Sequence, residues 1–308
     1  MKIVISDKLD ISDSGLSDLK KYSEIEIYND VVNDPVEIMK RIEGAEIITA
    51  NYIDITREVI INSPNLKYII SPAVGYDWID VKTATEKGIK VVNCPTFNTY
   101  AVAEHAIGLI FSVYRRVVEG HLQILEGKWQ SMQLTGHEVK NKKFLSIGYG
   151  NIGKPLCGLA SALGMDVKYC DSKTAEVDVN KLISEADIVA LCYPLTEKTK
   201  GSFDAKRISL MKSSAILINV ARGRVLDQDA LYMALKENKI LGAGLDVFND
   251  DATFTKANEE IINFAKLPNV VVTPHVGFNT EETKERFGGE LIKNIDAILA
   301  GNPINVVN

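Results

Sequence analysis

Two residues with enzyme-like chemistry follow predicted strands. His275 comes after the apolar run 270–273 and a proline, and Arg222 comes after the run 215–219. An imidazole can give or take a proton near neutral pH, and the planar guanidinium of an arginine can hold a carboxylate with two hydrogen bonds. Because ligands of open α/β sheets bind outside the carboxyl ends of the strands, we expect both side chains at that edge. An arginine after a strand is by itself more often a surface or ion-pair residue, so its role depends on the surrounding motif.

The other three histidines are weaker candidates for proton transfer. His105 and His121 lie in one long helical stretch, and His137 lies in a polar loop. Packed or solvated structural roles are the favoured interpretation for these three. We therefore predict that His275 is the acid–base residue.

A glycine-rich turn predicts a dinucleotide site. The segment Gly148-Tyr149-Gly150-Asn151-Ile152-Gly153 has the GxGxxG spacing, which is a weak signal alone. Here the apolar strand 144–147 leads into it, and a helix with Pro155 in its first turn follows. Such a turn brings a pyrophosphate close to free N–H groups at a helix N-terminus.

An acidic residue at the end of the next strand favours NAD over NADP. Asp171 follows the strand 167–170, where a carboxylate can accept hydrogen bonds from the adenosine ribose and repel a 2′-phosphate. Lys173 would offset part of that repulsion. The alternative is that Asp171 only forms a turn or caps a helix.

The elements that position these residues form two α/β series in a chain of 308 residues, which is more than one core usually organises. Short apolar runs alternate with helical segments, as in parallel sheets. The first series has predicted strands at 2–6, 25–28, 47–50, 68–71 and 91–93, and predicted helices at 35–42, 56–61 and 81–87. The second has predicted strands at 144–147, 167–170, 188–191, 215–219, 242–245 and 270–273.

Two helices determine the expected domain organisation. The stretch from Thr99 to about Leu125 is predicted to be one long helix that connects the domains, and the helix 281–299 is expected to return to the first series. The predicted fold is α/β with two doubly wound parallel-sheet domains. A Rossmann cofactor domain, 99–279, is inserted in a flavodoxin-like substrate domain, 1–98 plus 280–308.

The composition favours a cytoplasmic protein without a nucleic-acid or membrane partner. With 35 basic and 41 acidic residues the formal charge is −6, so no positive field attracts polyanions. No apolar stretch is long enough to span a membrane. The cysteines lack the spacing of a metal site or a disulfide framework, and we expect no metal; they are Cys94, Cys157, Cys170 and Cys192.

Six motifs, in this order, resemble the D-isomer-specific 2-hydroxyacid dehydrogenase family. They are Ala73-Val74-Gly75-Tyr76-Asp77-Trp78-Ile79-Asp80, Ala101-Val102-Ala103-Glu104-His105, the glycine turn, Asn219-Val220-Ala221-Arg222-Gly223, Gly244-Leu245-Asp246-Val247-Phe248 and Thr273-Pro274-His275-Val276-Gly277. The resemblance implies NAD-dependent hydride transfer between a small 2-keto acid and its D-2-hydroxy acid. It also implies a homodimer joined through the cofactor domain.

The resemblance also implies roles for single residues. Arg222 would bind the substrate carboxylate and carbonyl, His275 would be the acid–base residue, and Asp246 would hold the nicotinamide carboxamide. It further assigns four residues to the cofactor site: Pro194, Thr199, Val220 and Ala221.

One position departs from the family pattern. The family pairs its histidine with a glutamate, and the matching position here is Asp251. Aspartate is one methylene shorter, and its charge would still raise the pKa of the imidazole, although less if the distance grows. Asp250 next to it could take the same role, and the sequence leaves the choice open.

The substrate pocket is predicted to be small. Val74 and Gly75 offer consecutive N–H groups to a carboxylate, and Asn98 and Tyr52 are the other predicted contacts. Phosphoglycerate dehydrogenases of the family carry arginines in the region of 50–54, and this chain has none there. Glyoxylate, hydroxypyruvate, pyruvate or a slightly larger 2-keto acid would fit better. Phosphite or formate dehydrogenation is a further possibility within the fold, although the formate type has glutamine where Asp251 stands.

A protein of another class is the main alternative. Some relatives of this family are NAD-sensing corepressors that retain the catalytic residues. Such relatives usually carry extra disordered tails, whereas this sequence ends soon after its last predicted helix. We therefore favour the enzyme.

Overall fold

The computed structural model describes residues 1–249 and 256–308. The chain divides into two compact units, one of residues 1–98 with 279–308 and the other of residues 99–278. Each unit contains one parallel sheet. The predicted class, α/β with two doubly wound parallel-sheet domains, is confirmed.

The sheet of the first unit has the order β2-β1-β3-β4-β5. Its strands are β1 (Ile3–Ile5), β2 (Ile25–Ile27), β3 (Ile47–Thr49), β4 (Tyr68–Ser71) and β5 (Lys90–Asn93). Its helices are α1 (Asp13–Leu19), α2 (Pro35–Arg41), α3 (Arg57–Ile61), α4 (Val81–Glu86) and α12 (Glu281–Leu299). This is the flavodoxin-like order, in which the chain reverses direction across the sheet between β1 and β3.

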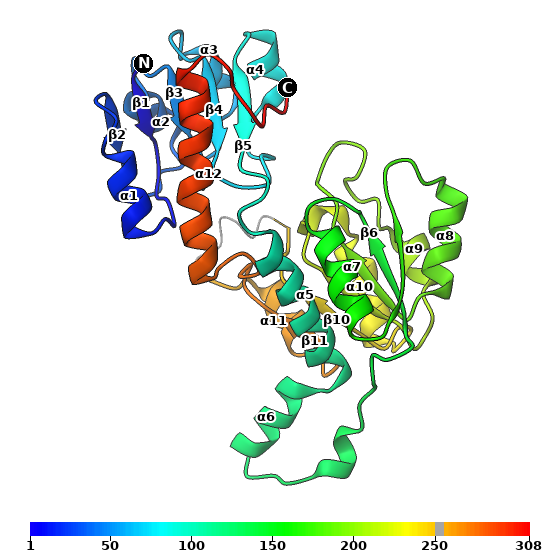
Figure 1. Cartoon of the computed structure of the whole chain (residues 1–308). Helices are drawn as coiled ribbons and strands as arrows, with labels where there is room; N and C mark the ends of the chain where they lie inside the picture. Colours follow the sequence, from blue (N-terminus) through cyan, green and yellow to red (C-terminus); the bar gives the residue numbers. More distant parts are fainter. Residues whose placement is uncertain (250–255) are drawn as a thin grey trace. The chain divides into compact units, whose positions relative to one another are not determined.

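Successive strand residues of the first unit face opposite helix layers. Ile3 and Ile5 pack with side chains of α1 and α12, whereas Val4 packs with side chains of α2, α3 and α4. Figure 1 shows α12 (red) beside α1 (blue) along one face of this sheet. The apolar runs that predict the strands are therefore runs that both layers bury.

Helix α1 was not expected from the sequence. It has only seven residues, and Ser12 caps it by accepting a hydrogen bond from the Gly15 N–H at 3.3 Å. A Cβ atom on Gly15 would lie 3.2 Å from the Cα atom of Gly288 in α12. Close packing on α12 therefore supports a helix whose own sequence pattern is too short to predict.

The sheet of the second unit has the order β11-β10-β9-β8-β6-β7. Its strands are β6 (Lys143–Ile147), β7 (Asp166–Cys170), β8 (Ile188–Leu191), β9 (Ile216–Asn219), β10 (Gly242–Leu245) and β11 (Val270–Val272). Its helices are α5 (Thr99–Tyr114), α6 (Val117–Leu125), α7 (Gly153–Ala162), α8 (Glu176–Glu185), α9 (Ala205–Leu210), α10 (Gln228–Lys236) and α11 (Glu259–Ala265), with short 3₁₀ turns at Ser131–Leu134 and Gly223–Val225. The order reverses between β6 and β8, so a ligand crevice is expected at their carboxyl ends.

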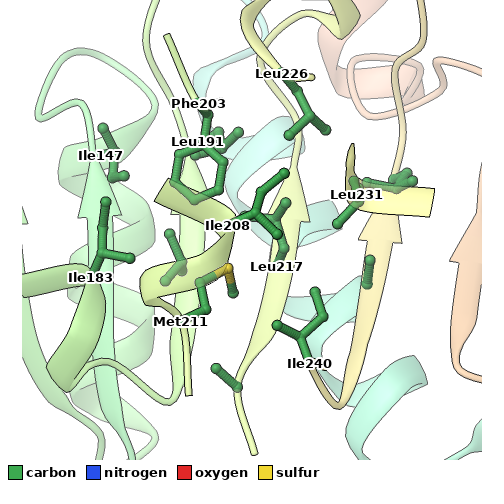
Figure 2. Close-up of a cluster of buried hydrophobic side chains, with 14 of the residues drawn as sticks. Ile147, Ile183, Leu191, Phe203, Ile208, Met211, Leu217, Leu226, Leu231 and Ile240 are labelled. Carbon is green, nitrogen blue, oxygen red and sulfur yellow. The ribbon is translucent and has the colours of Figure 1, made fainter. Parts of the chain in front are cut away.

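Helices cover both faces of this second sheet as well. Side chains of α5 and α7 pack on one face, and those of α8, α9, α10 and α11 pack on the other. Figure 2 shows part of the second layer, where Ile183 of α8 and Ile208 of α9 lie over Leu191 and Leu217 of the strands.

The prediction of one continuous helix from Thr99 to Leu125 is wrong. The chain breaks at Arg116, whose φ of 51° lies in the left-handed region, and α6 begins at the next residue. The Arg116 guanidinium holds the break by donating to the Glu119 carboxylate and to the Gln133 carbonyl. No proline or glycine marks this position, so the sequence carries no local signal for it. None of the helices in residues 1–249 and 256–308 is long and apolar enough to cross a membrane.

A buried carboxylate anchors the loop at the switch point of the first unit. Asp7 follows β1, is fully buried, and accepts hydrogen bonds from the backbone N–H groups of Asn51 at 3.1 Å and Tyr52 at 2.5 Å. Burial raises the pKa of Asp7 to about 6, although these N–H groups and the nearby Arg41 act to lower it. The loop that carries Tyr52 therefore depends on a carboxyl group that titrates close to neutrality.

We predict that Asp7 makes the stability of the protein fall as pH rises from about 4 to about 6. The folded protein holds the Asp7 proton more tightly than the unfolded chain, because the pKa rises from 3.8 to about 6. The decline should approach about 3 kcal/mol. Asp7→Asn should lack it, whereas Asp54→Asn, at an exposed position in the same loop, should keep it. Denaturant unfolding at pH 4, 5, 6 and 7 measures this, and equal slopes for Asp7→Asn and the parent would contradict it.

Candidate active site

The three glycines of the predicted dinucleotide turn have different surroundings. Gly148 follows β6 with φ +102°, which side chains rarely adopt, and a Cβ atom there would lie 2.5 Å from the Cys192 carbonyl oxygen. A Cβ atom on Gly153 would lie 2.1 Å from the carbonyl oxygen of Gly148. Gly150, by contrast, has nothing within 4 Å of its Cβ position. The first and third glycines are therefore required by packing, and the second leaves open space.

The helix that follows the turn has an uncapped N-terminus. No side chain caps α7, and the N–H groups of Gly150 and Ile152 donate no hydrogen bond within residues 1–249 and 256–308. The N-termini of α10 and α12, in contrast, are capped by Asp227 and Thr280. Free N–H groups and the positive end of a ten-residue helix suit a pyrophosphate.

Tyr149 can offer the cofactor its backbone rather than its ring. The ring stacks on that of Tyr169 in β7, with centroids 3.6 Å apart and planes 9° apart. Asn151, two residues further along the turn, has an interaction of its own within the protein.

Asp171 is both a turn residue and an available carboxylate. Its Oδ1 atom accepts hydrogen bonds from the Lys173 N–H at 2.9 Å and the Thr174 hydroxyl at 3.2 Å. The Lys173 N–H is the main cause that lowers the pKa of Asp171, so the group is charged. The second oxygen, Oδ2, makes no hydrogen bond within the described part of the chain and is exposed. Both sequence interpretations of this residue are therefore compatible with its geometry.

Pro194 and Thr199 lie in the loop after β8, next to the glycine turn. The Cys192 N–H donates to the Ile147 carbonyl at 2.8 Å, which joins the ends of β8 and β6. The Thr199 hydroxyl donates to the Pro194 carbonyl at 2.6 Å and closes the loop. This loop thus borders the point where the strand order reverses.

The segment after β9 positions Arg222. The Asn219 side chain accepts a hydrogen bond from the Ala221 N–H and donates one to the Arg222 carbonyl, both at 3.0 Å. Val220 and Ala221 are buried, whereas Arg222 is half-buried and its Nη1 donates to the Ala221 carbonyl at 2.8 Å. The side-chain amide of Asn219 therefore holds the segment after β9 in a loop, and this loop carries the Arg222 guanidinium.

His275 has an unusual backbone conformation. Its φ is +52°, and its N–H donates to the carbonyls of Asp246 at 2.8 Å and Thr273 at 3.0 Å. Its ring meets that of Phe278 edge to face, with centroids 6.0 Å apart. Because β9, β10 and β11 are neighbours in the sheet, Arg222, Asp246 and His275 follow three adjacent strands.

Asp246 is buried and bound by the segment around His275. Its Oδ1 accepts hydrogen bonds from the Thr273 hydroxyl at 2.6 Å and the Val276 N–H at 2.9 Å, and its Oδ2 accepts one from the Gly277 N–H at 2.9 Å. Burial acts to raise the pKa of Asp246, but hydrogen bonds from His105 and Thr273 outweigh it and the net pKa is lowered. The carboxylate is therefore charged within the protein.

His105 is the residue that sequence reasoning missed. Its Nε2 atom lies 3.0 Å from the Thr273 hydroxyl oxygen and 3.2 Å from Asp246 Oδ1. A signal existed, because Ala101 and Leu109, one helical turn away on either side, are buried. That spacing places His105 on the face of α5 that packs on the sheet.

The other predicted substrate contacts lie in the first unit. The carbonyls of Ala73, Val74 and Gly75 accept hydrogen bonds from Cys94 N–H, Asn93 and Ser71 respectively. The N–H groups of Val74 and Gly75 donate none within the described residues. This arrangement leaves two adjacent donors for an anion.

Tyr52 and Asn98 also lie in this unit. The Tyr52 hydroxyl donates to Asp10 at 2.6 Å. Asn98 is buried, and its side-chain oxygen has no hydrogen-bond partner among residues 1–249 and 256–308. Asp250 and Asp251, the two predicted partners of His275, lie outside the described residues.

Comparison with known proteins identifies the family. Residues 107–277 match the sequence model of the D-isomer specific 2-hydroxyacid dehydrogenase, NAD binding domain. The chain belongs to this family. A glyoxylate reductase of Thermococcus litoralis is 36% identical over 97% of this chain and 94% of its own length. The chain is accordingly an NAD-dependent oxidoreductase.

Two solved structures are similar to this chain over nearly its whole length. An acyclic imino acid reductase, Bsp5, in complex with NADPH and D-Arg has a TM-score of 0.91 and 33% identity, with 100% of both chains covered. A D-lactate dehydrogenase of Aquifex aeolicus, complexed with NAD and lactic acid, has a TM-score of 0.83 and 30% identity, with 98% of this chain and 96% of that chain covered.

The family's glycine turn yields a matched set of variants. Gly153→Ala should lower the free energy of unfolding by about 3 kcal/mol or more, because its Cβ meets a carbonyl oxygen. Gly150→Ala should leave stability unchanged and weaken NADH binding roughly tenfold or more, because the methyl group fills the approach of the pyrophosphate. Gly158→Ala, in α7 with nothing within 4 Å of its Cβ position, is the control. Thermal unfolding and NADH fluorescence titration measure both effects, and tight NADH binding by Gly150→Ala would contradict the assignment.

Proposed function

We propose that the protein reduces a small 2-keto acid to the D-2-hydroxy acid with NADH, and catalyses the reverse reaction with NAD. In this proposal residues 99–278 form the cofactor domain, and residues 1–98 with 279–308 form the substrate domain. The observation that carries the proposal is the placement of Arg222, Asp246 and His275 after three adjacent strands of the sheet that also carries the glycine turn.

The proposed roles follow from charge and proton chemistry. NADH, when bound, supplies the hydride that reaches the carbonyl carbon of the substrate. Arg222 binds the carboxylate and the carbonyl oxygen, where negative charge develops. His275 gives its proton to that oxygen and recovers it in the reverse direction. Asp251, or Asp250 next to it, is proposed to keep the imidazole protonated until hydride transfer.

The Val74 and Gly75 N–H groups are proposed to form an anion-binding turn for a substrate carboxylate within residues 1–98. The carbonyls of this loop are held by the protein, so the loop offers donors without acceptors that would repel an anion. Asn98, whose buried side-chain oxygen has no hydrogen-bond partner among the described residues, is proposed as a further polar contact for the substrate. Tyr52 is proposed to form a wall of the pocket with its ring, because Asp10 already holds its hydroxyl group.

These contacts favour a small acid such as glyoxylate, hydroxypyruvate or pyruvate. The similar proteins from Thermococcus litoralis and Aquifex aeolicus are named for glyoxylate and lactate. 3-Phosphoglycerate is disfavoured because the segment 50–54 has no arginine to pair with a phosphate.

Within the cofactor site, we propose that Asp171 Oδ2 accepts the ribose hydroxyls of NAD. Pro194, Thr199, Val220 and Ala221 would line the site, and the Oδ2 atom of Asp246, which accepts one hydrogen bond from the described residues, would hold the nicotinamide carboxamide. The imino acid reductase that resembles this chain was solved with NADPH. Lys173, two residues from Asp171, is the position at which a 2′-phosphate could be accepted instead.

A second candidate is reduction of an imino acid. The supporting observation is the TM-score of 0.91 to the acyclic imino acid reductase over the whole chain. The chemistry is closely related, because a hydride again reaches a carbon next to a carboxylate. A 2-keto acid mixed with an amine therefore belongs in the assay of function.

The test is NADH oxidation, followed at 340 nm, with glyoxylate, hydroxypyruvate, pyruvate and 3-phosphoglycerate, each alone and with methylamine. We expect turnover with a small 2-keto acid alone. His275→Ala should lower kcat by roughly 10²–10⁴-fold, and Arg222→Lys should lower kcat/KM by roughly 10²-fold, because the bidentate contact is lost. Lys206→Ala, at an exposed position on α9, is the control. Turnover only with methylamine would favour the imino acid reductase, and no turnover with NADH binding intact would favour an NAD-sensing protein.

We also propose that the protein is a homodimer joined through the cofactor domain. Helix α6 buries none of its residues, and it extends away from the sheet of its unit in Figure 1. Leu125 is 70% exposed, and Trp129 and Met132 are each 88% exposed. A groove of about 440 Å³ lies beside α6, lined by Val118, Leu122 and residues 265–271. So much exposed apolar surface in one segment is typical of a subunit interface.

Charged substitutions in this segment should separate the subunits. The parent should have twice the mass of the 33.9 kDa chain, and Leu125→Glu with Trp129→Glu should have the mass of one chain. Val177→Glu, which replaces an exposed apolar residue on α8, should leave the dimer intact. Size-exclusion chromatography with light scattering measures the mass, and a monomeric parent would contradict the proposal.

A further inference from the structure

The left-handed backbone of His275 needs external support. A non-glycine residue at φ +52° is in a sparsely populated region that persists only when its surroundings hold it. The His275 N–H meets two carbonyls, and the flanking Thr273, Val276 and Gly277 all donate to the carboxylate of Asp246. Residues 273–277 therefore form a turn around the buried carboxylate of Asp246.

His105 is a further donor beside the Asp246 carboxylate. Its Nε2 is within 3.2 Å of both the Thr273 hydroxyl oxygen and Asp246 Oδ1. The Thr273 hydroxyl has one proton, which it gives to Asp246 at 2.6 Å. Its oxygen can therefore only accept from His105, which assigns a proton to Nε2 of His105.

The packing leaves His105 little freedom to move. A Cβ atom on Gly277 would lie 2.9 Å from Asp246 Oδ2 and 3.3 Å from Cδ2 of His105. A Cβ atom on Gly244 of β10 would lie 2.9 Å from the Cβ atom of Leu109, one turn along α5. Helix α5 therefore packs directly against β10, the strand that precedes Asp246. This packing fixes the position of the His105 imidazole.

We propose that His105 is a positioning residue for the acid–base turn, acting on His275 through Thr273 and Asp246. This inference rests on the proposed role of His275. His105 itself contacts neither end of the proposed proton transfer. Its N–H keeps the Thr273 hydroxyl directed at Asp246, and Asp246 in turn keeps residues 275–277 in their observed conformation.

Loss of the His105 Nε2 donor should therefore lower kcat more than it weakens the binding of NADH. Without it the Thr273 hydroxyl can turn away, and the His275 ring spends less time in its reactive position. A displacement of about 1 Å can cost roughly 10²-fold in rate. The proposed pyrophosphate and ribose contacts of NADH lie at the glycine turn and Asp171, and Asp246 is proposed to hold the carboxamide alone, so NADH binding should change less than kcat.

The experiment compares substitutions that remove or keep one donor. His105→Leu removes the N–H, and His105→Gln keeps an N–H at a similar reach. Thr273→Val removes the hydroxyl at nearly constant volume. Lys206→Leu, at an exposed position on α9, is the control. The measurements are kcat and KM with the best 2-keto acid, the Kd of NADH by fluorescence, and Tm.

We expect His105→Leu and Thr273→Val to lower kcat roughly 10- to 100-fold, with the Kd of NADH changed less than about threefold. His105→Gln should recover most of the lost rate. In a His275→Ala background, His105→Leu should cause no further loss, because both changes act on the same step.

The opposite outcomes are distinct. A parent without turnover overturns the proposed function itself. An active parent whose His105→Leu variant keeps its kcat, or a loss that multiplies with that of His275→Ala, overturns the positioning role. A higher Kd of NADH at unchanged kcat would also overturn it, because the network would then serve the nicotinamide. If His105→Leu fails to fold, Thr273→Val and His105→Gln decide the same question.

Discussion

A buried carboxylate must be surrounded by donors, and this requirement shapes the edge of the sheet in residues 99–278. Asp246 is 3% exposed and charged, and an unpaired charge there would cost several kcal/mol. Its donors come from α5 and from the turn after β11. That turn reaches the carboxylate with His275 in a left-handed backbone conformation. The geometry of the proposed acid–base residue is thus a consequence of neutralising the charge beside it.

The same sheet edge also carries donors that remain unused. The helix after the glycine turn has no side-chain cap, whereas most helices of the described chain have a Ser, Thr, Asp or Asn cap that satisfies their first N–H groups. Helices α6 and α8 also lack a side-chain cap, and α7 differs from them because it follows the glycine turn. A capping side chain at α7 would occupy the space that an anion needs. The donors that bind Asp246 therefore hold the turn of residues 273–277 in place. The N–H groups of Gly150 and Ile152 at the start of α7 have no such partner within the described residues, and a phosphate is expected to bind there.

The sequence predicts most of the elements because the central strands are short apolar runs buried on both faces, and the helix Glu281–Leu299 has the predicted bounds. It does not predict the break at Arg116, since nothing in the residue type signals a left-handed backbone there. It places Arg222 and His275 after strands, because strand ends can be read from the loss of apolar residues. It does not reveal His105, whose contacts depend on how α5 is seated on β10. Side chains that act through tertiary contacts leave only a periodicity in the sequence, and here that periodicity also fits simple core packing.

The net charge of −6 raises the question of how an acidic protein would hold two anions, a 2-keto acid and a dinucleotide. At physiological ionic strength the field of distant charges is screened within about 8 Å, so only the groups at each site matter. The groups proposed here are backbone N–H donors at Val74, Gly75 and the start of α7, together with one arginine. Backbone donors are fixed in direction and do not titrate, so they select an anion by its shape rather than by total charge. The carboxylates of Asp171 and Asp246 do not prevent an anion from binding nearby. Each accepts hydrogen bonds from neighbouring residues, and the N–H groups proposed to bind the anion lie at other backbone positions.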